Sequence, residues 1–147
     1  MKVIKLFTSI HKSTKRNYLK RMNDNKPYHM SLAKKYSKDY WDGSRKSGYG
    51  GYKYIENYWV PIAKKLIKKY NLSNRSSLLD VGCGKGFLLF EIKKLLPGIK
   101  IEGLDISRYA IKNSPKSIQK YLKIGNAGKK FKFRNKKFDL AISLGCV

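Results

Sequence analysis

The spacing of apolar residues over positions 58–70 follows the period of an α-helix. The residues that share one face of that helix are Trp59, Ala63, Leu66, Ile67 and Tyr70. Lysines take the opposite face, and Pro61 suits the first turn, where its missing N–H costs no hydrogen bond. The pattern therefore predicts an amphipathic helix that packs on a sheet.

From residue 77 onward, short apolar runs alternate with helical segments. The strands we expect are residues 77–81, 100–105, 121–126 and 138–144, and the helices are residues 87–96 and 108–112. Ser107 is a suitable N-cap for the second helix, and Pro115 must close it. Strands that alternate with helices pair in parallel through right-handed crossovers. The sequence predicts a Rossmann-like, doubly wound α/β fold, a mainly parallel sheet with helices on both faces, truncated after the fourth strand.

Residues 1–57 form a basic, aromatic-rich arm ahead of this alternating region. Residues 11–40 have few apolar side chains and predict one or two short basic helices. Four glycines and several aromatic residues then fall between Trp41 and Tyr54, which favours a loop with stacked rings over a helix.

The charge of the chain is strongly positive, with 34 Lys and Arg against nine Asp and Glu, a net charge of +25. Such a charge raises the question of a nucleic-acid partner. Nucleic acid is nevertheless not favoured, because Lys far outnumbers Arg and the lysines are spread over both halves of the chain.

Cysteine usage and hydropathy indicate the compartment. Cys83 and Cys146 cannot form a disulfide framework, and neither belongs to a cluster with metal-site spacing, so we expect a cytoplasmic protein without a metal. No stretch approaches the roughly 20 apolar residues that a membrane span needs.

The stretch "LLDVGCGKGFLLFE", residues 78–91, places three glycines between a predicted strand and a predicted helix. A dinucleotide fingerprint would require a third glycine at position 87, where Phe87 stands. A P-loop is excluded as well, because no Gly-Lys-Ser/Thr ends the turn. The turn therefore predicts a different nucleoside-bearing ligand.

The run from Asp80 to Gly86 resembles the first motif of the class I S-adenosylmethionine-dependent methyltransferases, and the resemblance extends from about residue 59 to residue 147. It implies S-adenosylmethionine as the cofactor and residues 58–147 as the incomplete cofactor-binding half of such a domain. Asp80 matches the acidic residue that fixes the cofactor's amino group. The turn residues matched as contacts to the methionine part are Gly82, Cys83, Gly84 and Gly86.

The resemblance continues at the ends of the later strands. Asp105 matches the acidic residue that accepts the ribose hydroxyls, and Ile106 matches an apolar contact to the adenine. Asn126, followed by Ala127, stands where an Asp more usually meets the adenine amino group, and an amide oxygen can accept the same hydrogen bond. The fourth-strand match is completed by Asp139, Ser143 and Leu144.

The implied reaction is methyl transfer to a small molecule or to a metabolite or cell-surface precursor. The alternatives are an RNA methyltransferase and a non-catalytic cofactor-binding fragment. The fourth strand is followed by "SLGCV" in place of an Asp/Asn-Pro-Pro-aromatic motif, which counts against enzymes that methylate exocyclic amines of nucleic acids. No general base is identified and the oligomeric state is left open. The expected four strands, in a family whose sheets have seven, predict an N-terminal fragment that is poorly stable and inactive alone.

The arm is the one place where acceptor specificity is expected. Arg45, Tyr49, Tyr52 and Tyr54 can form a lid over the cofactor and an aromatic wall for a substrate. Two other interpretations stay open: the rings pack the arm onto the sheet, or they stack on nucleobases.

Overall fold

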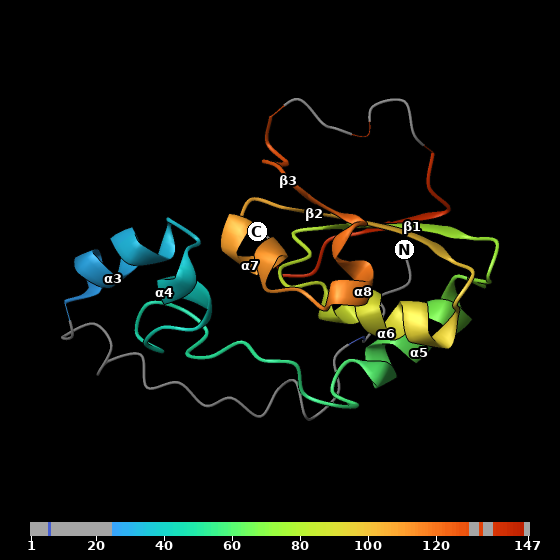
Figure 1. Ribbon diagram of the computed structural model, residues 1–147, viewed down its shortest axis with the longest axis horizontal. Coiled ribbons are helices and arrows are strands. Elements are labelled where there is room, and N and C mark those ends of the chain that lie inside the picture. The colour runs from blue at the N-terminus through green and yellow to red at the C-terminus, as the bar shows by residue number, and fades with distance from the viewer. Residues whose placement is uncertain (1–5, 7–24, 130–132, 134–136, 146–147) are drawn as a thin grey trace.

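The sheet has four parallel strands in the order β3-β2-β1-β4 (Figure 1). The computed structural model describes residues 6, 25–129, 133 and 137–145. The strands are β1, Ser77–Val81; β2, Lys100–Asp105; β3, Leu122–Ile124; and β4, Leu140–Ile142. In the register, Leu78 lies between Ile101 and Leu140. The strand order reverses between β1 and β4, so the doubly wound parallel fold is confirmed, with its ligand-binding edge expected at the carboxyl ends of the strands.

Four helices accompany the sheet in the described residues: α5, Val60–Lys69; α6, Phe87–Leu95; α7, Arg108–Lys112; and α8, Lys116–Gln119. Helices α5, α6 and α8 lie on one face of the sheet (Figure 1). Their contact with the strands forms the main core, in which Leu66, Leu78, Leu89 and Ile92 are fully or almost fully buried.

Both faces of the central strands are buried, which explains why β1 and β2 carry apolar residues on both faces. Leu78 and Ile101 face the helices, whereas Leu79 and Leu104 belong to a second cluster with Phe133. The described helices thus cover one face, and aromatic side chains from the segment between β3 and β4 cover part of the other.

Most predicted elements are confirmed to within two residues at their ends. Ser107 caps α7 as predicted, since its Oγ accepts from the Ala110 N–H at 3.0 Å. Helix α8 is missed by the sequence, because Pro115 ends one helix and also precedes the next. Strands β3 and β4 are shorter than predicted; the Gly125 N–H still donates to the Asp105 carbonyl at 2.9 Å, which continues the pairing with β2 one residue beyond Ile124.

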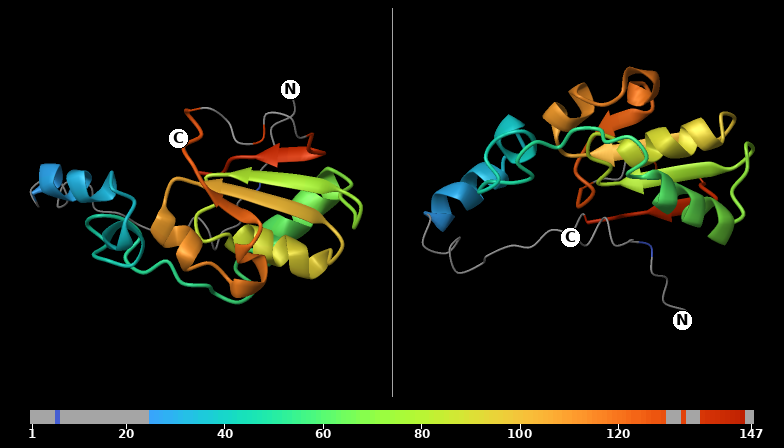
Figure 2. Two further views of the ribbon diagram at one scale, coloured as in Figure 1. Left: turned by 45° about the horizontal axis from the view of Figure 1, so that its top comes forward. Right: turned by 90° about the horizontal axis from the view of Figure 1, so that it is seen from below.

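The arm contains two short helices, α3, Lys26–Ala33, and α4, Lys38–Trp41, and a long loop that leads to α5 (Figure 2). The predicted ring stacking is confirmed: Trp41 stacks on Tyr49 with centroids 5.3 Å apart, and Tyr52 stacks on Phe87 at 5.1 Å. The part of the helix prediction that falls on residues 11–24 lies outside the described residues.

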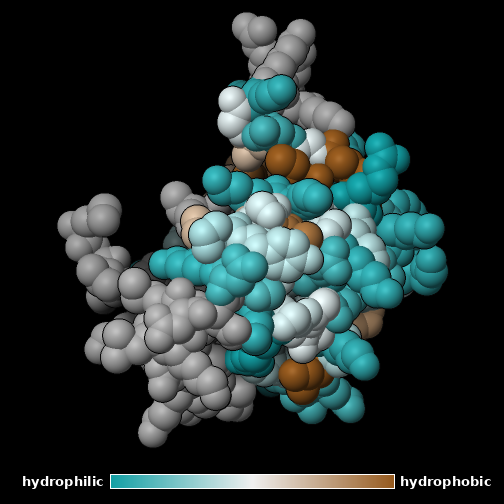
Figure 3. Space-filling view, turned by 90° about the vertical axis from the view of Figure 1, so that its left-hand side faces the viewer, coloured by the Kyte–Doolittle hydropathy of each residue, from teal (hydrophilic) through white to brown (hydrophobic). Residues whose placement is uncertain are grey.

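The surface on the side of α3, α4 and α7 is mainly hydrophilic, with apolar side chains in small separate groups (Figure 3). None of the helices in the described part of the chain is long and apolar enough to span a bilayer.

Candidate functional site

The glycine turn, residues 82–86, connects the carboxyl end of β1 to the start of α6. Gly84 and Gly86 adopt φ angles of +57° and +72°, a conformation that side-chain-bearing residues rarely take. Space is also restricted: a Cβ on Gly84 would lie 2.8 Å from the Trp41 ring, and one on Gly86 would lie 2.9 Å from Ile118. Glycine is therefore required at both positions by conformation and by packing.

The turn is tied to the end of β2 through its own backbone. The N–H groups of Gly82 and Cys83 donate to the Leu104 carbonyl at 2.7 and 3.1 Å. The Gly84 N–H donates to Oδ2 of Asp105 at 2.7 Å. The ends of β1 and β2 thus form one rigid unit.

Asp105 is buried at the carboxyl end of β2. Its two oxygens accept from the backbone N–H groups of Gly84 and Ser107, each at 2.7 Å. Burial raises the pKa of this carboxyl, and the two N–H bonds partly oppose that rise. An ionised carboxylate has about four acceptor sites. Two acceptor sites therefore remain, which fits the paired hydroxyls of a ribose.

Asp80, at the end of β1, is a buried carboxyl for which the described part of the chain supplies no hydrogen-bond donor. Its residue is 4% exposed, and among the described residues no side chain or backbone group donates a hydrogen bond to its carboxyl. Burial, followed by the charge of nearby Asp105, raises the pKa of Asp80 to about 7. Buried polar groups are normally satisfied. An unsatisfied carboxyl beside the turn fits a cationic group of a ligand.

The other residues matched to the cofactor site follow the carboxyl ends of the strands. Ile106 follows β2 and is 47% exposed. Asn126 and Ala127 follow β3 and are exposed, and the Asn126 side-chain oxygen accepts from the Gly128 N–H at 2.8 Å. Ser143 and Leu144 follow β4. Because the strands are parallel, all these residues lie at the same edge of the sheet as Asp80 and Asp105.

The arm residues predicted as a lid have different positions. Tyr52 stacks on Phe87 at the start of α6, and the Tyr54 hydroxyl donates to the buried carboxylate of Glu91 on the same helix. Tyr49 stacks on Trp41, and Arg45 is exposed beside Gly50. Tyr52 and Tyr54 therefore attach the arm to α6, as the packing interpretation expects.

Sequence reasoning missed the residues that join the arm to the glycine turn. Lys85 is 4% exposed, and its Nζ donates to both carboxylate oxygens of Asp42 at 2.8 and 2.7 Å. The Trp41 indole N–H donates to the Ser107 hydroxyl at 2.8 Å. The sequence does single out both residues: Asp42 is one of only nine acidic residues and lies in the loop of stacked rings, and Lys85 interrupts a turn of small residues.

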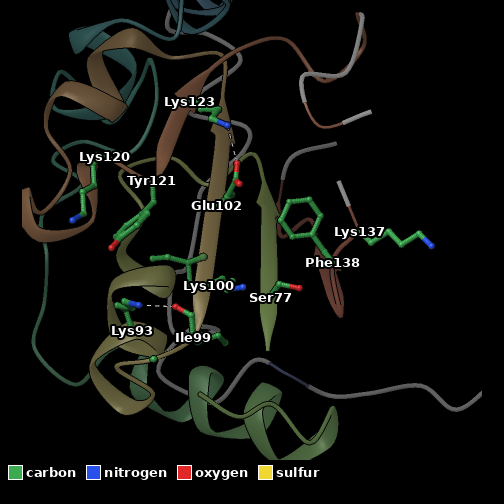
Figure 4. A pocket seen from close by; sticks show the side chains of 12 residues that line it. Ser77, Lys93, Ile99, Lys100, Glu102, Lys120, Tyr121, Lys123, Lys137 and Phe138 are labelled. Carbon is green, nitrogen blue, oxygen red and sulfur yellow. Dashed lines mark hydrogen bonds and ion pairs between the residues drawn. The ribbon is translucent and has the colours of Figure 1, made fainter. Parts of the chain in front are cut away.

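A pocket of about 490 Å³ lies elsewhere, at the amino ends of β1 and β2, where Ser77 and Lys100 line it (Figure 4). Lys93 in this pocket donates to the Ile99 carbonyl at 2.6 Å, and Lys123 pairs with Glu102 at 2.9 Å. The pocket is at the opposite end of the strands from Asp80 and Asp105, and none of the matched cofactor residues lines it.

A comparison with known proteins finds a family match over the part of the chain that contains β1 to β4. A family model described as a methyltransferase domain matches residues 72–146. No protein of curated function matches the sequence. The chain is similar in structure to coclaurine N-methyltransferase bound to N-methylheliamine and SAH, at 13% identity and a TM-score of 0.50, covering 92% of this chain and 44% of that one.

Two further solved structures are similar. One is from Methanococcus maripaludis and is described as an S-adenosylmethionine-dependent methyltransferase; it is 18% identical, with a TM-score of 0.49, covering 90% of this chain and 53% of that one. The other is YjhP from E. coli, at 19% identity and a TM-score of 0.49, covering 63% of this chain and 38% of that one. The chain thus spans between 38% and 53% of the length of these three structures.

Proposed function

The chain belongs to the methyltransferase domain family, and from that premise we propose that it takes part in methyl transfer from S-adenosylmethionine to a small-molecule acceptor. The observation that carries the proposal is the buried carboxyl of Asp80 beside the glycine turn, to which no described group donates a hydrogen bond. Burying a carboxyl without a hydrogen-bond donor costs folding free energy when no ligand is bound. The ammonium group of the cofactor's methionine part supplies the missing partner.

The remaining matched residues account for the other parts of the cofactor. The backbone of the turn, residues 82–86, lies against the methionine part, and Asp105 accepts from the ribose hydroxyls with the acceptor sites that Gly84 and Ser107 leave open. Ile106, Asn126 and Ala127 contact the adenine, with Ser143 and Leu144 completing the wall.

The cofactor supplies a methyl group already activated by a positive sulfur. What the chain contributes is therefore orientation and the exclusion of water from the reacting atoms. In the proposed arrangement, residues 58–147 form the cofactor-binding half, and residues 1–57 form an arm that covers the bound cofactor. The aromatic loop of the arm supports this role, because Tyr52 and Trp41 pack directly on the start of α6 and on the glycine turn.

A small-molecule acceptor, or a metabolite or cell-surface precursor, is favoured over nucleic acid. The lysines of the chain are spread over both halves of the sequence, without one dominant cluster. Of the rings in the aromatic loop, Tyr49, Tyr52 and Tyr54 already pack on protein partners, which leaves them poorly placed to stack on bases.

Calorimetric titration of the chain with S-adenosylhomocysteine tests the cofactor assignment. Asp105→Ala removes a charged acceptor from two hydroxyl groups, and at about 1.5–3 kcal/mol for each hydrogen bond to a charged group we expect binding to weaken at least 100-fold. Asp139→Ala is the matched control, because this carboxylate also accepts two bonds, from the Ser77 N–H and hydroxyl, at the other end of the sheet.

The control variant should bind S-adenosylhomocysteine as the wild-type chain does. Circular dichroism on each variant establishes that it is folded before titration. Equal affinity in Asp105→Ala and Asp139→Ala would contradict the ribose assignment, and failure of the folded wild-type chain to bind would contradict the proposed function.

A further inference from the structure

Lys85 is a buried cation in the middle of the glycine turn, and every described hydrogen bond of its Nζ goes to the arm. Its partners are the two carboxylate oxygens of Asp42 and the Tyr52 carbonyl, the latter at 2.8 Å. A buried ammonium is stable only when it is paired and hydrogen-bonded. Removing the arm would therefore leave this charge without its acceptors.

Asp42 connects three parts of the molecule. Besides Lys85, it accepts from the Tyr109 hydroxyl on α7 at 2.8 Å and from the Tyr52 N–H at 3.0 Å. Burial opposes ionisation of Asp42, but the hydrogen bonds from Lys85 and Tyr109 outweigh it, so the pKa of this carboxyl lies below its ordinary value. The carboxylate is therefore ionised at neutral pH and holds the turn, the arm and α7 together.

Trp41 precedes Asp42 and extends the contact toward Asp105. Its ring lies so close to Gly84 that a Cβ there would approach within 2.8 Å, and its N–H donates to the Ser107 hydroxyl. Gly84 and Ser107 are the two residues whose backbone N–H groups hold the carboxylate of Asp105. The position of Trp41 is thus linked to the geometry of the proposed ribose site.

We propose that Lys85 is a positioning residue: its ion pair with Asp42 holds Trp41 against Gly84 and Ser107, so that Trp41 forms a fixed wall of the cofactor pocket. This inference rests on the proposed function. Cofactor binding and arm docking then favour each other, since a ligand that contacts Trp41 in its docked position stabilises the docked arm.

The first test measures arm docking without cofactor. Trypsin cleaves after Arg45, Lys46 and Lys53, all in the loop that Lys85 holds. We expect Lys85→Met to accelerate cleavage in this loop about tenfold, in the range typical of a coupling between sites. Lys123→Met is the matched control, because it breaks a lysine ion pair with Glu102 that does not involve the arm. Equal cleavage of the loop in wild type and Lys85→Met would overturn the role of Lys85.

The second test measures S-adenosylhomocysteine affinity by calorimetry in the full chain. Lys85→Met and Asp42→Asn should each weaken binding about tenfold, and the double variant should be no weaker than either single one, because both remove the same ion pair. Exchange of the two charges, Lys85→Asp with Asp42→Lys, should recover part of the lost affinity. Additive losses, or an affinity change no larger than in Lys123→Met, would overturn the proposal.

Emission from Trp41 separates positioning from a general loss of stability. In a Trp59→Phe background Trp41 is the single tryptophan, since the chain has two. Its emission should shift to the red in Lys85→Met at temperatures well below the melting transition, and an unshifted spectrum would contradict the inference. Failure of the wild-type chain to bind S-adenosylhomocysteine would instead contradict the proposed function, which keeps the two failures distinguishable.

Discussion

Replacement of Asp80 by Asn tests whether an unpartnered acid is built into the fold. The carboxyl is buried, and its pKa is raised to about 7, by burial first and by the charge of Asp105 second. The unfolded chain has the ordinary value of 3.8. Well below pH 3.8 both states are protonated, so the group costs nothing there. As the pH rises from about 3 to 7, the unfolded chain loses its proton while the folded chain keeps it, and stability falls.

The magnitude follows from the difference between the two pKa values. A shift from 3.8 to about 7 corresponds to about 4 kcal/mol, at about 1.4 kcal/mol for each unit. Between pH 4.5 and pH 8 the expected loss from this one group is about 3 kcal/mol, because part of the loss has occurred by pH 4.5. That is a large fraction of the 5–15 kcal/mol that typically stabilises a domain. Asp105, whose pKa is also raised, contributes in the same direction.

The assay is urea unfolding of wild type and Asp80→Asn at pH 4.5 and pH 8. Both chains carry Asp105, so subtracting the two pH dependences isolates Asp80. We expect the wild-type chain to lose about 3 kcal/mol more than Asp80→Asn over this interval. Parallel pH profiles for the two proteins would refute the reasoning, because they would mean that Asp80 is ionised in the folded chain.

The carboxyl of Asp80 should also make ligand affinity depend on pH, with affinity rising over the range in which stability falls. A cofactor ammonium beside Asp80 favours the ionised acid, so binding releases a proton near neutral pH. Affinity for S-adenosylhomocysteine should therefore rise between pH 5.5 and pH 7.5 in the wild-type chain and change less in Asp80→Asn. Titrations in two buffers of different ionisation enthalpy would detect the released proton, and a release that persists in Asp80→Asn would assign it to another group.

Two further substitutions test the packing of the turn and of the arm. Gly84→Ala should reduce stability in urea unfolding by about 1–2 kcal/mol more than Gly145→Ala. Both glycines have left-handed φ angles, but only an alanine at position 84 would press its methyl group against Trp41. Equal losses of stability would contradict this contact. Tyr54→Phe should lower the free energy of unfolding by about 1–3 kcal/mol, because it removes the hydroxyl donor from the carboxylate of Glu91, which is 2% exposed. An unchanged free energy of unfolding at pH 8 would show that this hydrogen bond does not stabilise the arm.

The sequence predicts well those elements whose limits follow from the local pattern of apolar and polar residues. Strands β1 and β2 are apolar on both faces and end at polar residues or glycines, so their limits follow from local pattern. The N-cap at Ser107 is likewise local, since its partner is three residues away. Helix α8 has four residues and no periodicity to detect, and it is set by packing of Ile118 into the core.

The candidate site is likewise predictable only where its residues follow from local sequence patterns. Motif spacing and resemblance place Asp80 and Asp105 on adjacent strands, and the topology brings their carboxyl ends together. The pair of Lys85 and Asp42 is 43 residues apart in sequence, and no local pattern predicts such a contact. A single sequence identifies the charges but cannot pair them, because the pairing depends on how the arm crosses the turn.

The two buried charges at the glycine turn differ in how they are satisfied, and this difference determines what the turn can bind. Lys85 is fully paired within the chain, whereas Asp80 keeps a raised pKa although the protein carries 25 excess positive charges. Surface lysines are screened by solvent and salt over distances of about 10 Å, so they cannot replace a direct contact. Pairing Lys85 internally removes a positive charge that could neutralise Asp80. In the proposed site the turn therefore presents an acid to the ligand, and a ligand with an ammonium group would supply a contact that the described residues do not make.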